Sequence, residues 1–525
     1  METIVNPILR GFNPDPSIVR VGPDYYIATS TFEWAPGIQL YHSRDLGNWR
    51  SLGGALRRQS QLDLRGYPAS AGVWAPNLSC IDGRYYLVYT LVSATGLLKD
   101  THNYLVWADD IAGDWSEPIY LDSRGFDPSL FRDADGRTWL VGMMWDYRSD
   151  RNHFAGISIR EISLPECRFV GPYRTIFKGT ELGRTEGPHL YRKDDWYYLL
   201  VAEGGTEYGH AVTIARSRKL EGPYEAHPDN PLLSSRDDPF LALQRAGHGD
   251  LVSTTNDEWY MVHLCGRPLP TKGRCIMGRE TCIQRIEWSE DGWPRLAGGD
   301  RHPKVEAPAP SRDRSEKPLA AVPSRDDFDA PTLGPQYLTL RTHADESWLS
   351  LKARDGYLRL IGREGLSSRF LQSLVARRID AFVGTAETCL EFEPDDFRQM
   401  AGLILYYDIT KYYYLRISRD ETIGLCAGII AADGISVCQI GAELPIASGR
   451  CFLKAELEYE RLRFSCSPDG KSWTRVGPEL DASILSDEQP GEGRFTGAML
   501  GLCCQDSGDG RRPADFDYLG WWPSE

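Results

Sequence analysis

A short phrase recurs five times in the first 300 residues and limits the folds open to this chain. Each copy places a four-residue segment, such as Asp15-Pro16-Ser17-Ile18, at the start of an apolar strand, before a turn rich in Asp or Gly and an aromatic strand. The copies begin at 15, 75, 127, 187 and about 249, which is a period of roughly 50 to 60 residues. Short alternating strands repeated at this length are typical of a β-propeller with one four-stranded sheet per blade. The sequence therefore predicts a five-bladed propeller.

The repeat also predicts where side chains gather, because the first strand of each blade lines the central axis. Asp15 lies between two prolines, whose rings fix φ and hold the carboxylate on stiff backbone. An Asp-Pro dipeptide is about as often an ordinary turn, so the functional signal is the convergence of equivalent positions. The residues at these positions are Asp15, Trp74 with Ala75, Asp127, Glu186 and His248.

The convergence would bring three carboxylates together at one end of the central axis, in a polar hollow named here the cup. This arrangement suits the hydrolysis of a glycosidic bond. That reaction needs one carboxylic acid to protonate the leaving oxygen and one carboxylate to act on the other face of the sugar. A neighbouring carboxylate raises the pKa of the acid. The chain also has 15 tryptophans and 26 tyrosines, which suit sugar stacking, although most of them must form blade cores.

The charge balance argues against a nucleic acid partner, because a formal net charge of −15 does not suit phosphate binding. No stretch approaches the ~20 apolar residues that cross a bilayer, and the first residues lack the pattern of a secretion signal. The 12 cysteines lie mostly in apolar runs without metal-binding spacing, which favours buried free thiols over disulfides. We therefore expect a cytoplasmic protein with no membrane segment.

Composition divides the chain into three parts. Residues 1–300 form the predicted propeller, 301–322 read as a linker with an Ala-Pro-Ala-Pro run, and 323–525 form a second domain. Short alternating strands with turn signals predict a β-sandwich there. No long helical period occurs, so the expected fold class is all-β.

Several motifs in order resemble the β-xylosidases of glycoside hydrolase family 43. They are the segments 11–17, 74–77, 126–129, 185–189 and 278–281. The resemblance spans almost the whole chain, since the second half looks like the concanavalin-like, jelly-roll sandwich that these xylosidases carry. It implies an exo-acting xylosidase rather than a single-domain arabinanase.

The resemblance also implies residue roles. Asp15 would be the general base, Glu186 the general acid, and Asp127 the residue that orients Glu186 and adjusts its pKa. Arg279 would bind the sugar in the cleavage subsite, and a loop of the sandwich, around residues 495–506, would close the pocket. The other residues that would shape the substrate site are Phe32, Trp74, Ala75, Lys99, Phe126, Trp145, Thr206 and His248.

Several of these residues have a plainer interpretation. His248 could hydrogen-bond backbone at the axis or support a water or cation, and a single histidine is poor support for a catalytic metal. Arg279 could form a structural salt bridge with Glu280, and Lys99 could belong to a solvated loop. We expect no required cofactor, although Asp326, Asp327 and Asp515 could hold a structural calcium or form a solvated strand edge.

The sequence thus predicts an exo-β-1,4-xylosidase that removes xylose from the non-reducing end of xylo-oligosaccharides with inversion. The enzymatic alternative is an α-L-arabinofuranosidase or a bifunctional enzyme. A retaining fructosidase is less favoured because its Asn-Asp-Pro-Asn motif is absent, and a non-catalytic sugar-binding propeller is remote because all three carboxylates remain. We expect a homo-oligomer, dimer or tetramer, and the tyrosines at 406–407 and 412–414 could form either an interface or a core.

Overall fold

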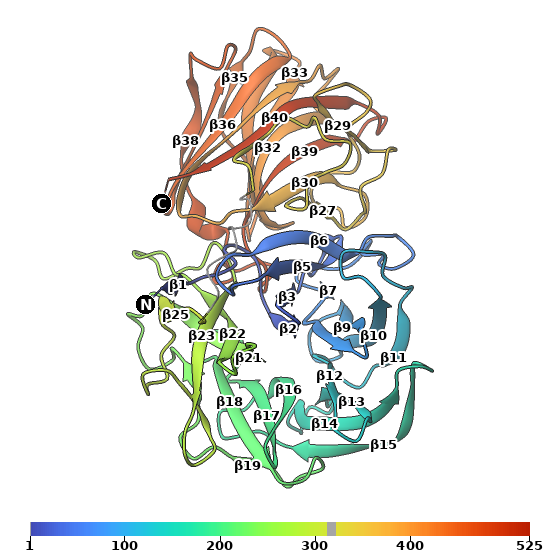
Figure 1. The fold of residues 1–525 in the computed structure, drawn as a ribbon. Helices are drawn as coiled ribbons and strands as arrows, with labels where there is room; N and C mark the ends of the chain where they lie inside the picture. The colour runs from blue at the N-terminus through green and yellow to red at the C-terminus, as the bar shows by residue number, and fades with distance from the viewer. Residues whose placement is uncertain (1, 312–321, 525) are drawn as a thin grey trace.

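The computed structural model describes residues 2–311 and 322–524 and confirms the predicted all-β fold of propeller and sandwich (Figure 1). The one helix among these residues is a short 3-10 helix, η1 (Ala482–Ile484). No helix in the described ranges is long and apolar enough to cross a membrane.

Five sheets are arranged around a central axis, and each corresponds to one copy of the repeat (Figure 1). Blade 1 contains β2 (Ser17–Val21), β3 (Asp24–Thr29), β5 (Gly37–Ser43) and β6 (Arg50–Leu56). Blade 2 contains β7 (Gly72–Val73), β8 (Asn77–Ile81), β9 (Arg84–Ala94), β10 (Asp100–Ala108) and β11 (Ile119–Asp122). Blade 3 contains β12 (Ser129–Arg132), β13 (Thr138–Trp145), β14 (Phe154–Ser163) and β15 (Arg168–Phe177). Blade 4 contains β16 (Glu186–Lys193), β17 (Trp196–Glu203), β18 (Ala211–Ser217), β19 (Glu225–Ala226) and β20 (Leu233–Ser234). Blade 5 contains β21 (Gln244–Ser253), β22 (Trp259–Gly266), β23 (Glu280–Trp288) and β24 (Pro294–Leu296).

The recurring phrase is the inner strand of each blade, a tight turn and the second strand. In blade 2 the turn between β8 and β9 is Asp82-Gly83, with φ of 52° and 81°. Positive φ at both central residues is the hairpin geometry that matches strand twist, and Asp-Gly is a preferred sequence for it. The local sequence therefore sets the register of these hairpins.

A ring of polar side chains joins the five inner strands around the axis. Each member lies two residues after a floor position of the cup, so the repeat supplies one per blade: Ser17, Asn77, Ser129, His189 and Asp250. Ser17 Oγ donates to Asp250 Oδ2 (2.9 Å), and Asn77 Nδ2 donates to Ser17 Oγ (3.1 Å). Asn77 Oδ1 accepts from the Leu130 backbone N–H, Ser129 Oγ donates to the Pro188 carbonyl, and His189 Nδ1 lies 3.6 Å from Asp250 Oδ1. These contacts link every blade to its neighbours directly below the cup.

Part of the predicted linker belongs to the propeller. β25 (Glu306–Pro308) pairs antiparallel with β1 (Thr3–Val5), and Asn6 Nδ2 donates to the Ile283 and Lys304 carbonyls. This two-stranded ribbon suits Pro308, because proline is tolerated at strand edges. Residues 312–321 of the predicted linker lie outside the described residues.

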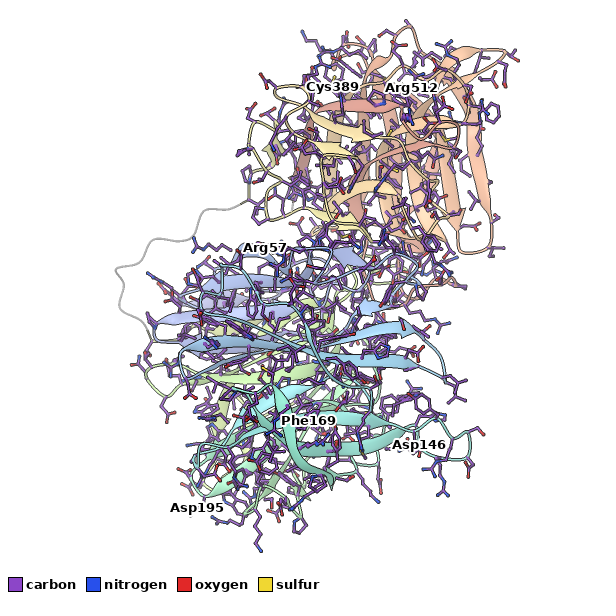
Figure 2. The ribbon with its side chains drawn as sticks, turned by 90° about the vertical axis from the view of Figure 1, so that its right-hand side faces the viewer. Arg57, Asp146, Phe169, Asp195, Cys389 and Arg512 are labelled. Carbon is purple, nitrogen blue, oxygen red and sulfur yellow. The ribbon has the colours of Figure 1, made fainter. Side chains whose placement is uncertain are left out.

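The second domain is a sandwich of two large antiparallel sheets (Figure 2). One sheet contains β28 (Leu349–Ser350), β29 (Leu358–Ile361), β40 (Pro513–Pro523), β31 (Val383–Glu391), β36 (Arg450–Glu458), β37 (Arg461–Ser467) and β38 (Thr474–Asp481), with β26 (Arg325–Asp326) on β40. The other contains β35 (Val437–Pro445), β34 (Gly424–Asp433), β33 (Lys411–Asp420), β32 (Gln399–Asp408), β39 (Met499–Asp506), β30 (Ser373–Arg378) and β27 (Leu338–Leu340).

The two domains share a sheet. β4 (Trp34–Ala35) leaves blade 1 and pairs with β27 at the edge of the second sandwich sheet. Tyr406, Tyr412 and Tyr414 pack with Trp34 in one apolar cluster between the domains, while Tyr407 and Tyr413 point into the sandwich core. All five tyrosines are buried within this chain, so the core interpretation is correct, and their alternation follows the two-residue period of a strand.

The candidate calcium ligands are engaged in other contacts. Asp515 accepts two hydrogen bonds from Arg359, at 2.7 Å each, and also pairs with Arg354. Asp327 pairs with Arg325, and no group of three or more metal-binding side chains occurs among the described residues. The calcium site stays a prediction.

Candidate active site

A cavity of about 650 Å³ opens at the end of the propeller axis, where the sandwich meets the blades. All twelve residues that the sequence pointed to line it: Asp15, Phe32, Trp74, Ala75, Lys99, Phe126, Asp127, Trp145, Glu186, Thr206, His248 and Arg279. They come from all five blades, so the convergence expected from the repeat is realised.

The floor of the cavity is built by an unusual backbone conformation that four of the five blades share. Asp15, Asp127 and His248 have φ of 54°, 54° and 48°, and Gly187 has 54°. Non-glycine residues rarely adopt this left-handed region, and strained backbone of this kind clusters at functional sites. Gly187, not Glu186, occupies the repeated position in blade 4, so Glu186 reaches the cup from one residue earlier, the position of Trp74 and Phe126.

Asp15 is held by the strongest polar contacts of the cup. Arg279 Nη1 donates to its Oδ1 (2.7 Å), and Ser30 Oγ donates to its Oδ2 (2.6 Å). Asp15 and Arg279 are 5% and 2% exposed, so the pair is shielded from water. The structural salt bridge expected as an alternative for Arg279 is wrong, because Glu280 pairs instead with Arg267 (2.7 Å).

Glu186 and Asp127 are two buried carboxyls that both resist ionisation. Burial, followed by the charge of Asp15, raises the pKa of Glu186 to about 7. Burial, followed by the charges of Glu186 and Asp15, raises the pKa of Asp127, although the Gly187 N–H donates to Asp127 Oδ2 (3.0 Å). Burial and neighbouring negative charge therefore favour the protonated form of each carboxyl.

His248 lies at the axis in its neutral form. Burial lowers the pKa of His248 to about 4. Its ring lies against Gly187, where an added Cβ would come within 3.0 Å of the imidazole. Glycine at position 187 therefore serves the left-handed backbone and this close approach together.

Aromatic rings form a continuous wall around the cup. Trp74 is the centre, with ring centroids 5.2 Å from Phe126, 6.4 Å from Phe32 and 5.8 Å from Phe495. Trp145 continues the wall beyond Phe126. The Lys99 ammonium lies 4.5 Å from the Trp145 ring centroid and donates to the Gly96 carbonyl. Lys99 therefore lines the cavity and is not part of a fully solvated loop.

The sandwich closes one side of the cavity with the segment 485–498, between η1 and β39, named here the closing loop. Glu492, Arg494 and Phe495 line the cavity, and the Phe495 carbonyl accepts from Arg279 Nη2 (3.0 Å). The loop predicted at 495–506 is therefore placed too far along the chain, because residues 499–506 form strand β39 in the sheet. Only its first residue reaches the pocket.

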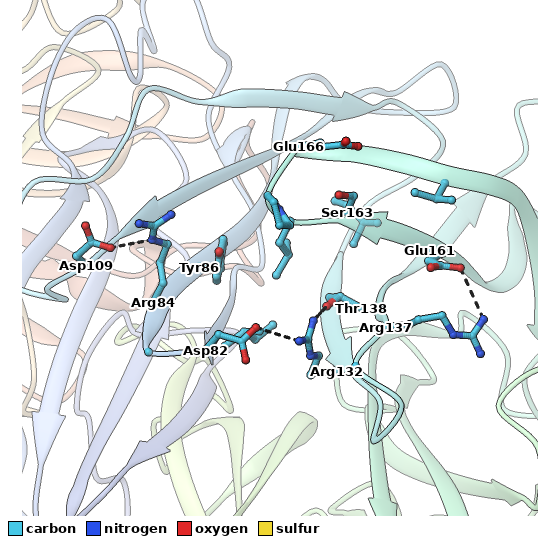
Figure 3. A pocket seen from close by; sticks show the side chains of 17 residues that line it. Asp82, Arg84, Tyr86, Asp109, Arg132, Arg137, Thr138, Glu161, Ser163 and Glu166 are labelled. Carbon is cyan, nitrogen blue, oxygen red and sulfur yellow. Dashed lines mark hydrogen bonds and ion pairs between the residues drawn. The ribbon is translucent and has the colours of Figure 1, made fainter.

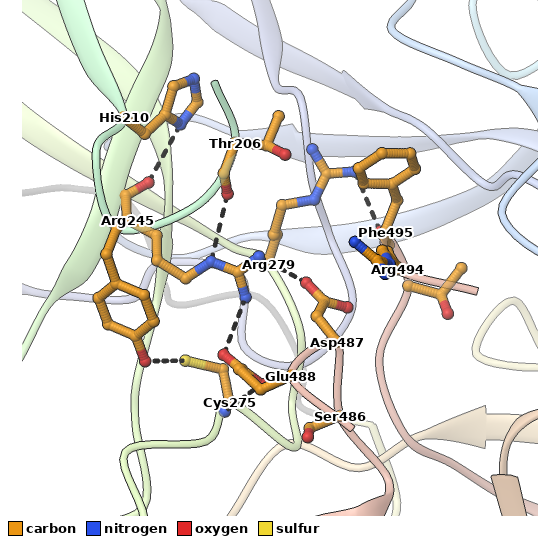
Figure 4. A network of polar contacts seen from close by, with 12 residues as sticks. Thr206, His210, Arg245, Cys275, Arg279, Ser486, Asp487, Glu488, Arg494 and Phe495 are labelled. Carbon is orange, nitrogen blue, oxygen red and sulfur yellow. Dashed lines mark hydrogen bonds and ion pairs between the residues drawn. The ribbon is translucent and has the colours of Figure 1, made fainter. Parts of the chain in front are cut away.

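Buried charges hold the closing loop from both domains, and Figure 4 shows the contacts made by Arg245 of the propeller. In the sandwich, Lys411 Nζ donates to the Gly493 carbonyl (2.8 Å), and Asp408 Oδ2 accepts from the Gly493 N–H (2.9 Å). In the propeller, Arg245 Nη2 donates to Asp487 Oδ2 (2.6 Å) and Arg245 Nε donates to the Thr206 carbonyl (3.2 Å). One arginine thus connects the closing loop with a blade 4 segment that lines the cavity.

Sequence reasoning missed part of the lining. Arg184 directly precedes the Thr185-Glu186 motif and could have been found from it, whereas no local signal marks the closing loop. The cavity residues that were not anticipated are Ala69, Ser70, Thr95, Gly96, His153, Phe154, Arg184, Gly205, Glu207, Glu492 and Arg494.

A second cavity, of about 730 Å³, lies between blades 2 and 3, along the turns of their strands (Figure 3). Its charged side chains are already paired, as in Arg132 with Asp82 (2.9 Å) and Arg84 with Asp109 (2.7 Å). None of the predicted site residues lines it. The axial cavity is therefore the candidate active site.

Comparison with known proteins gives a family match for each domain. The family described as "Glycosyl hydrolases family 43" matches residues 4–294, and "Beta xylosidase C-terminal Concanavalin A-like domain" matches residues 325–521. The crystal structure of a xylan β-1,4-xylosidase from Bacillus halodurans C-125 is 52% identical, with a TM-score of 0.96, covering 99% of this chain and 100% of that one.

Two curated relatives have different names. A xylan 1,3-β-xylosidase from a Vibrio species is 46% identical over 532 residues, covering 98% of each chain. A xylosidase/arabinosidase from Humicola insolens is 45% identical over 542 residues, covering 100% of this chain and 98% of that one.

Proposed function

The chain belongs to glycosyl hydrolases family 43, and from this premise we propose that it is an exo-acting β-xylosidase. Its substrates would be short β-1,4-xylo-oligosaccharides, from which it removes xylose at the non-reducing end. Membership of this family argues against both the retaining fructosidase and the non-catalytic sugar-binding propeller. A cytoplasmic location and a dimeric or tetrameric assembly belong to the same proposal and rest on the sequence alone.

One observation carries the proposal: a buried acid and a buried carboxylate with its arginine line one aromatic pocket. Glu186, whose pKa is about 7, can hold a proton at neutral pH and donate it to the leaving oxygen. Asp15, paired with Arg279, can accept a proton from the water that attacks the anomeric carbon. Asp127 lies beside the acid, and burial together with the charge of Glu186 raises the pKa of Asp127.

The proposed step is a single displacement. The bond between water and the anomeric carbon forms as the glycosidic bond breaks, Asp15 takes the water proton, and Glu186 gives its proton to the departing oxygen. The configuration at the anomeric carbon inverts. Both groups then exchange a proton with solvent to restore the starting state.

The exo mode is supported by the closing loop. Phe495 stacks 6.2 Å from Phe32 and shuts the side of the pocket that faces the sandwich. A pocket closed at one end accepts a terminal sugar only. The aromatic wall and Arg279 would hold this xylose, and Lys99 would contact the sugar that leaves.

The names of relatives support two variants of this function. A relative named as a xylan 1,3-β-xylosidase supports a β-1,3 linkage as the alternative to the proposed β-1,4 linkage. Another named as both xylosidase and arabinosidase supports a bifunctional enzyme as the second candidate, because the two pentoses place similar hydroxyls around the cleaved bond.

Proton NMR of xylobiose hydrolysis tests the proposal. We expect α-xylose as the first product, because inversion converts the β-linkage. Glu186→Gln and Asp15→Asn should each lower kcat by about 10²–10⁴-fold, the usual contribution of a general acid or base. Glu166→Gln, which removes an exposed carboxylate outside the pocket, is the control and should hydrolyse xylobiose like the wild type.

Two other outcomes would change the assignment. β-Xylose as the first product would mean that one carboxylate is a nucleophile and the displacement is double. Parallel assays with 1,3-linked xylobiose and an aryl α-L-arabinofuranoside decide between the linkages and the two sugars.

A further inference from the structure

Three cationic side chains line the mouth of the active-site cavity: Lys99, Arg184 and Arg494. Among the described residues, no ion pair engages the guanidinium of Arg184 or of Arg494. The carboxylates at the same rim are fewer. Glu492 is compensated by its pair with Arg369 (2.8 Å). Glu207, which is exposed, contributes one negative charge against the three cations. The mouth therefore has an excess of uncompensated positive charge, in a protein whose net charge is −15.

This charge lies on the side of the general acid. Arg184 is two residues before Glu186, and the charges of Arg184 and Lys99 both lower the pKa of Glu186 against the effect of burial. An acid that protonates the leaving oxygen must lie within hydrogen-bond reach of it. The leaving group therefore passes the cations, while the cleaved xylose lies deeper, between Arg279 and the aromatic wall.

The structure fixes the backbone turn that carries Arg184. Its backbone is in the left-handed region, with φ of 52°. Glu203, buried without a cationic partner, accepts hydrogen bonds from Thr180 N–H, Thr180 Oγ1, Thr185 Oγ1 and Thr213 Oγ1 at 2.6 to 2.8 Å. These bonds tie down the turn on which Arg184 lies. Its side chain crosses Gly205, where an added Cβ would lie 2.5 Å from Arg184 Nη1.

Arg494 approaches from the other domain. Its backbone N–H and that of Phe495 donate to Ser70 Oγ, at 2.9 and 3.1 Å, which fixes this part of the closing loop against blade 2. The side chain of Arg494 is exposed at the mouth. Two guanidinium groups, one from each domain, thus line the mouth of the cavity.

We propose that the leaving-group side of this pocket binds a carboxylate, so that the preferred substrates are acidic xylo-oligosaccharides with a uronic acid on the leaving xylose. A guanidinium binds a carboxylate through two parallel hydrogen bonds, whereas a neutral sugar needs no net charge at this place. The inference rests on the proposed xylosidase function and names its substrate class.

Matched substrates test it. The rate ratio is kcat/KM for 3-carboxyphenyl β-D-xyloside divided by kcat/KM for the neutral 3-carbamoylphenyl β-D-xyloside, measured on the full chain. Intrinsic differences between the two leaving groups cancel when variants are compared with the wild type. We expect Arg184→Gln and Arg494→Gln each to lower this ratio by about threefold to tenfold, as partly exposed charge pairs do.

Three further measurements identify what causes the preference for the carboxylate substrate. Raising the salt from about 0.05 M to about 0.5 M should lower the wild-type ratio, because the added ions shorten the Debye length and screen the charges. Arg184→Lys should restore part of the ratio lost in Arg184→Gln. Xylobiose with an α-1,2-linked glucuronic acid on its reducing-end xylose should be hydrolysed at least as well as plain xylobiose.

The outcomes separate this inference from the proposed function. A ratio that neither glutamine variant nor salt changes overturns the carboxylate site, and refusal of the glucuronic acid substrate overturns the uronic assignment. If the wild type does not hydrolyse the neutral xyloside, the proposed function itself fails and the inference with it. Arg494→Gln changes an exposed side chain, so it stays informative if Arg184→Gln does not fold.

Discussion

At the scale of single residues, the chemistry depends on how burial and charge set Glu186. Two opposing effects set the pKa of its carboxyl. Burial and Asp15 disfavour its ionised form, while Arg279, Arg184 and Lys99 favour it. The result, a pKa of about 7, matches the requirement that a general acid be protonated at working pH.

This balance predicts the alkaline limb of the pH profile. Because the acid must hold its proton, kcat/KM for xylobiose should be maximal below about pH 7 and fall as the pH rises through the pKa of about 7. Arg184→Gln removes a charge that favours the ionised form, so the limb should move to higher pH. Arg137→Gln, a surface arginine far from the pocket, is the control. A limb that stays in place or moves to lower pH in Arg184→Gln contradicts the electrostatic role.

At the scale of elements, the inner strands form the floor of the pocket and the closing loop forms one of its sides. The inner strands recur in all five blades and place the floor residues by register, with a left-handed backbone in four of them. The closing loop has no counterpart in the repeat and fills the open side of the pocket through Phe495. Gly278 permits its docking, because a Cβ there would lie 2.0 Å from the Thr496 carbonyl oxygen.

Removing the Phe495 ring should therefore weaken substrate binding more than it weakens the fold. Phe495→Ala opens the pocket between Phe32 and Trp74, and we expect KM for xylobiose to rise by about tenfold, the scale of one lost apolar contact of about 1.5 kcal/mol. Steady-state kinetics and a thermal melt measure the two effects. Phe397→Ala, at an exposed phenylalanine elsewhere in the sandwich (54% exposed), is the matched control. Equal effects of the two variants on KM would show that the loop does not contact substrate.

At the scale of the whole molecule, the pocket exists only while both domains are docked. β4 pairs with the sandwich sheet, and Arg245 joins blade 4 to the closing loop (Figure 4). The Arg245 and Asp487 side chains are 2% and 5% exposed, so neither charge is stabilised by water when its partner is removed.

Arg245→Met should accordingly destabilise the docked state. Leaving a buried carboxylate unpaired costs about 3–5 kcal/mol, and the Thr206 carbonyl would lose its donor. Urea denaturation followed by tryptophan fluorescence should show the loss, with activity lost at a lower urea concentration than the bulk of the fluorescence change. Arg84→Met breaks an exposed pair with Asp109 in blade 2, whose side chains are 42% and 73% exposed, and should cost far less, because exposed ion pairs contribute little to stability. Similar midpoints for the two variants would contradict the role of Arg245.

Much of the propeller could be predicted because its information is local. Hairpins such as Asp82-Gly83 and the period of the phrase predict each blade, and the blades bring Asp15, Asp127, Glu186 and His248 to one end of the axis. The repeat accounts for these residues and for Trp74 and Ala75. The other predicted cavity residues, among them Phe32, Lys99 and Arg279, came from the resemblance to a known family, which also supplied the roles.

The sequence by itself thus determined the all-β fold, the five blades, the sandwich and the residues of the pocket floor. Only the tertiary structure decided that Arg279 pairs with Asp15 and not Glu280, that residues 306–308 pair with the first strand, and that Glu492, Arg494 and Phe495 complete the pocket. It also decided the left-handed backbone at the floor and the free charge of Arg184. The physical reason is that strands and turns depend on residues that are neighbours along the chain. The contacts named above join segments more than 200 residues apart through shape and charge, and such pairs produce no periodic pattern in the sequence.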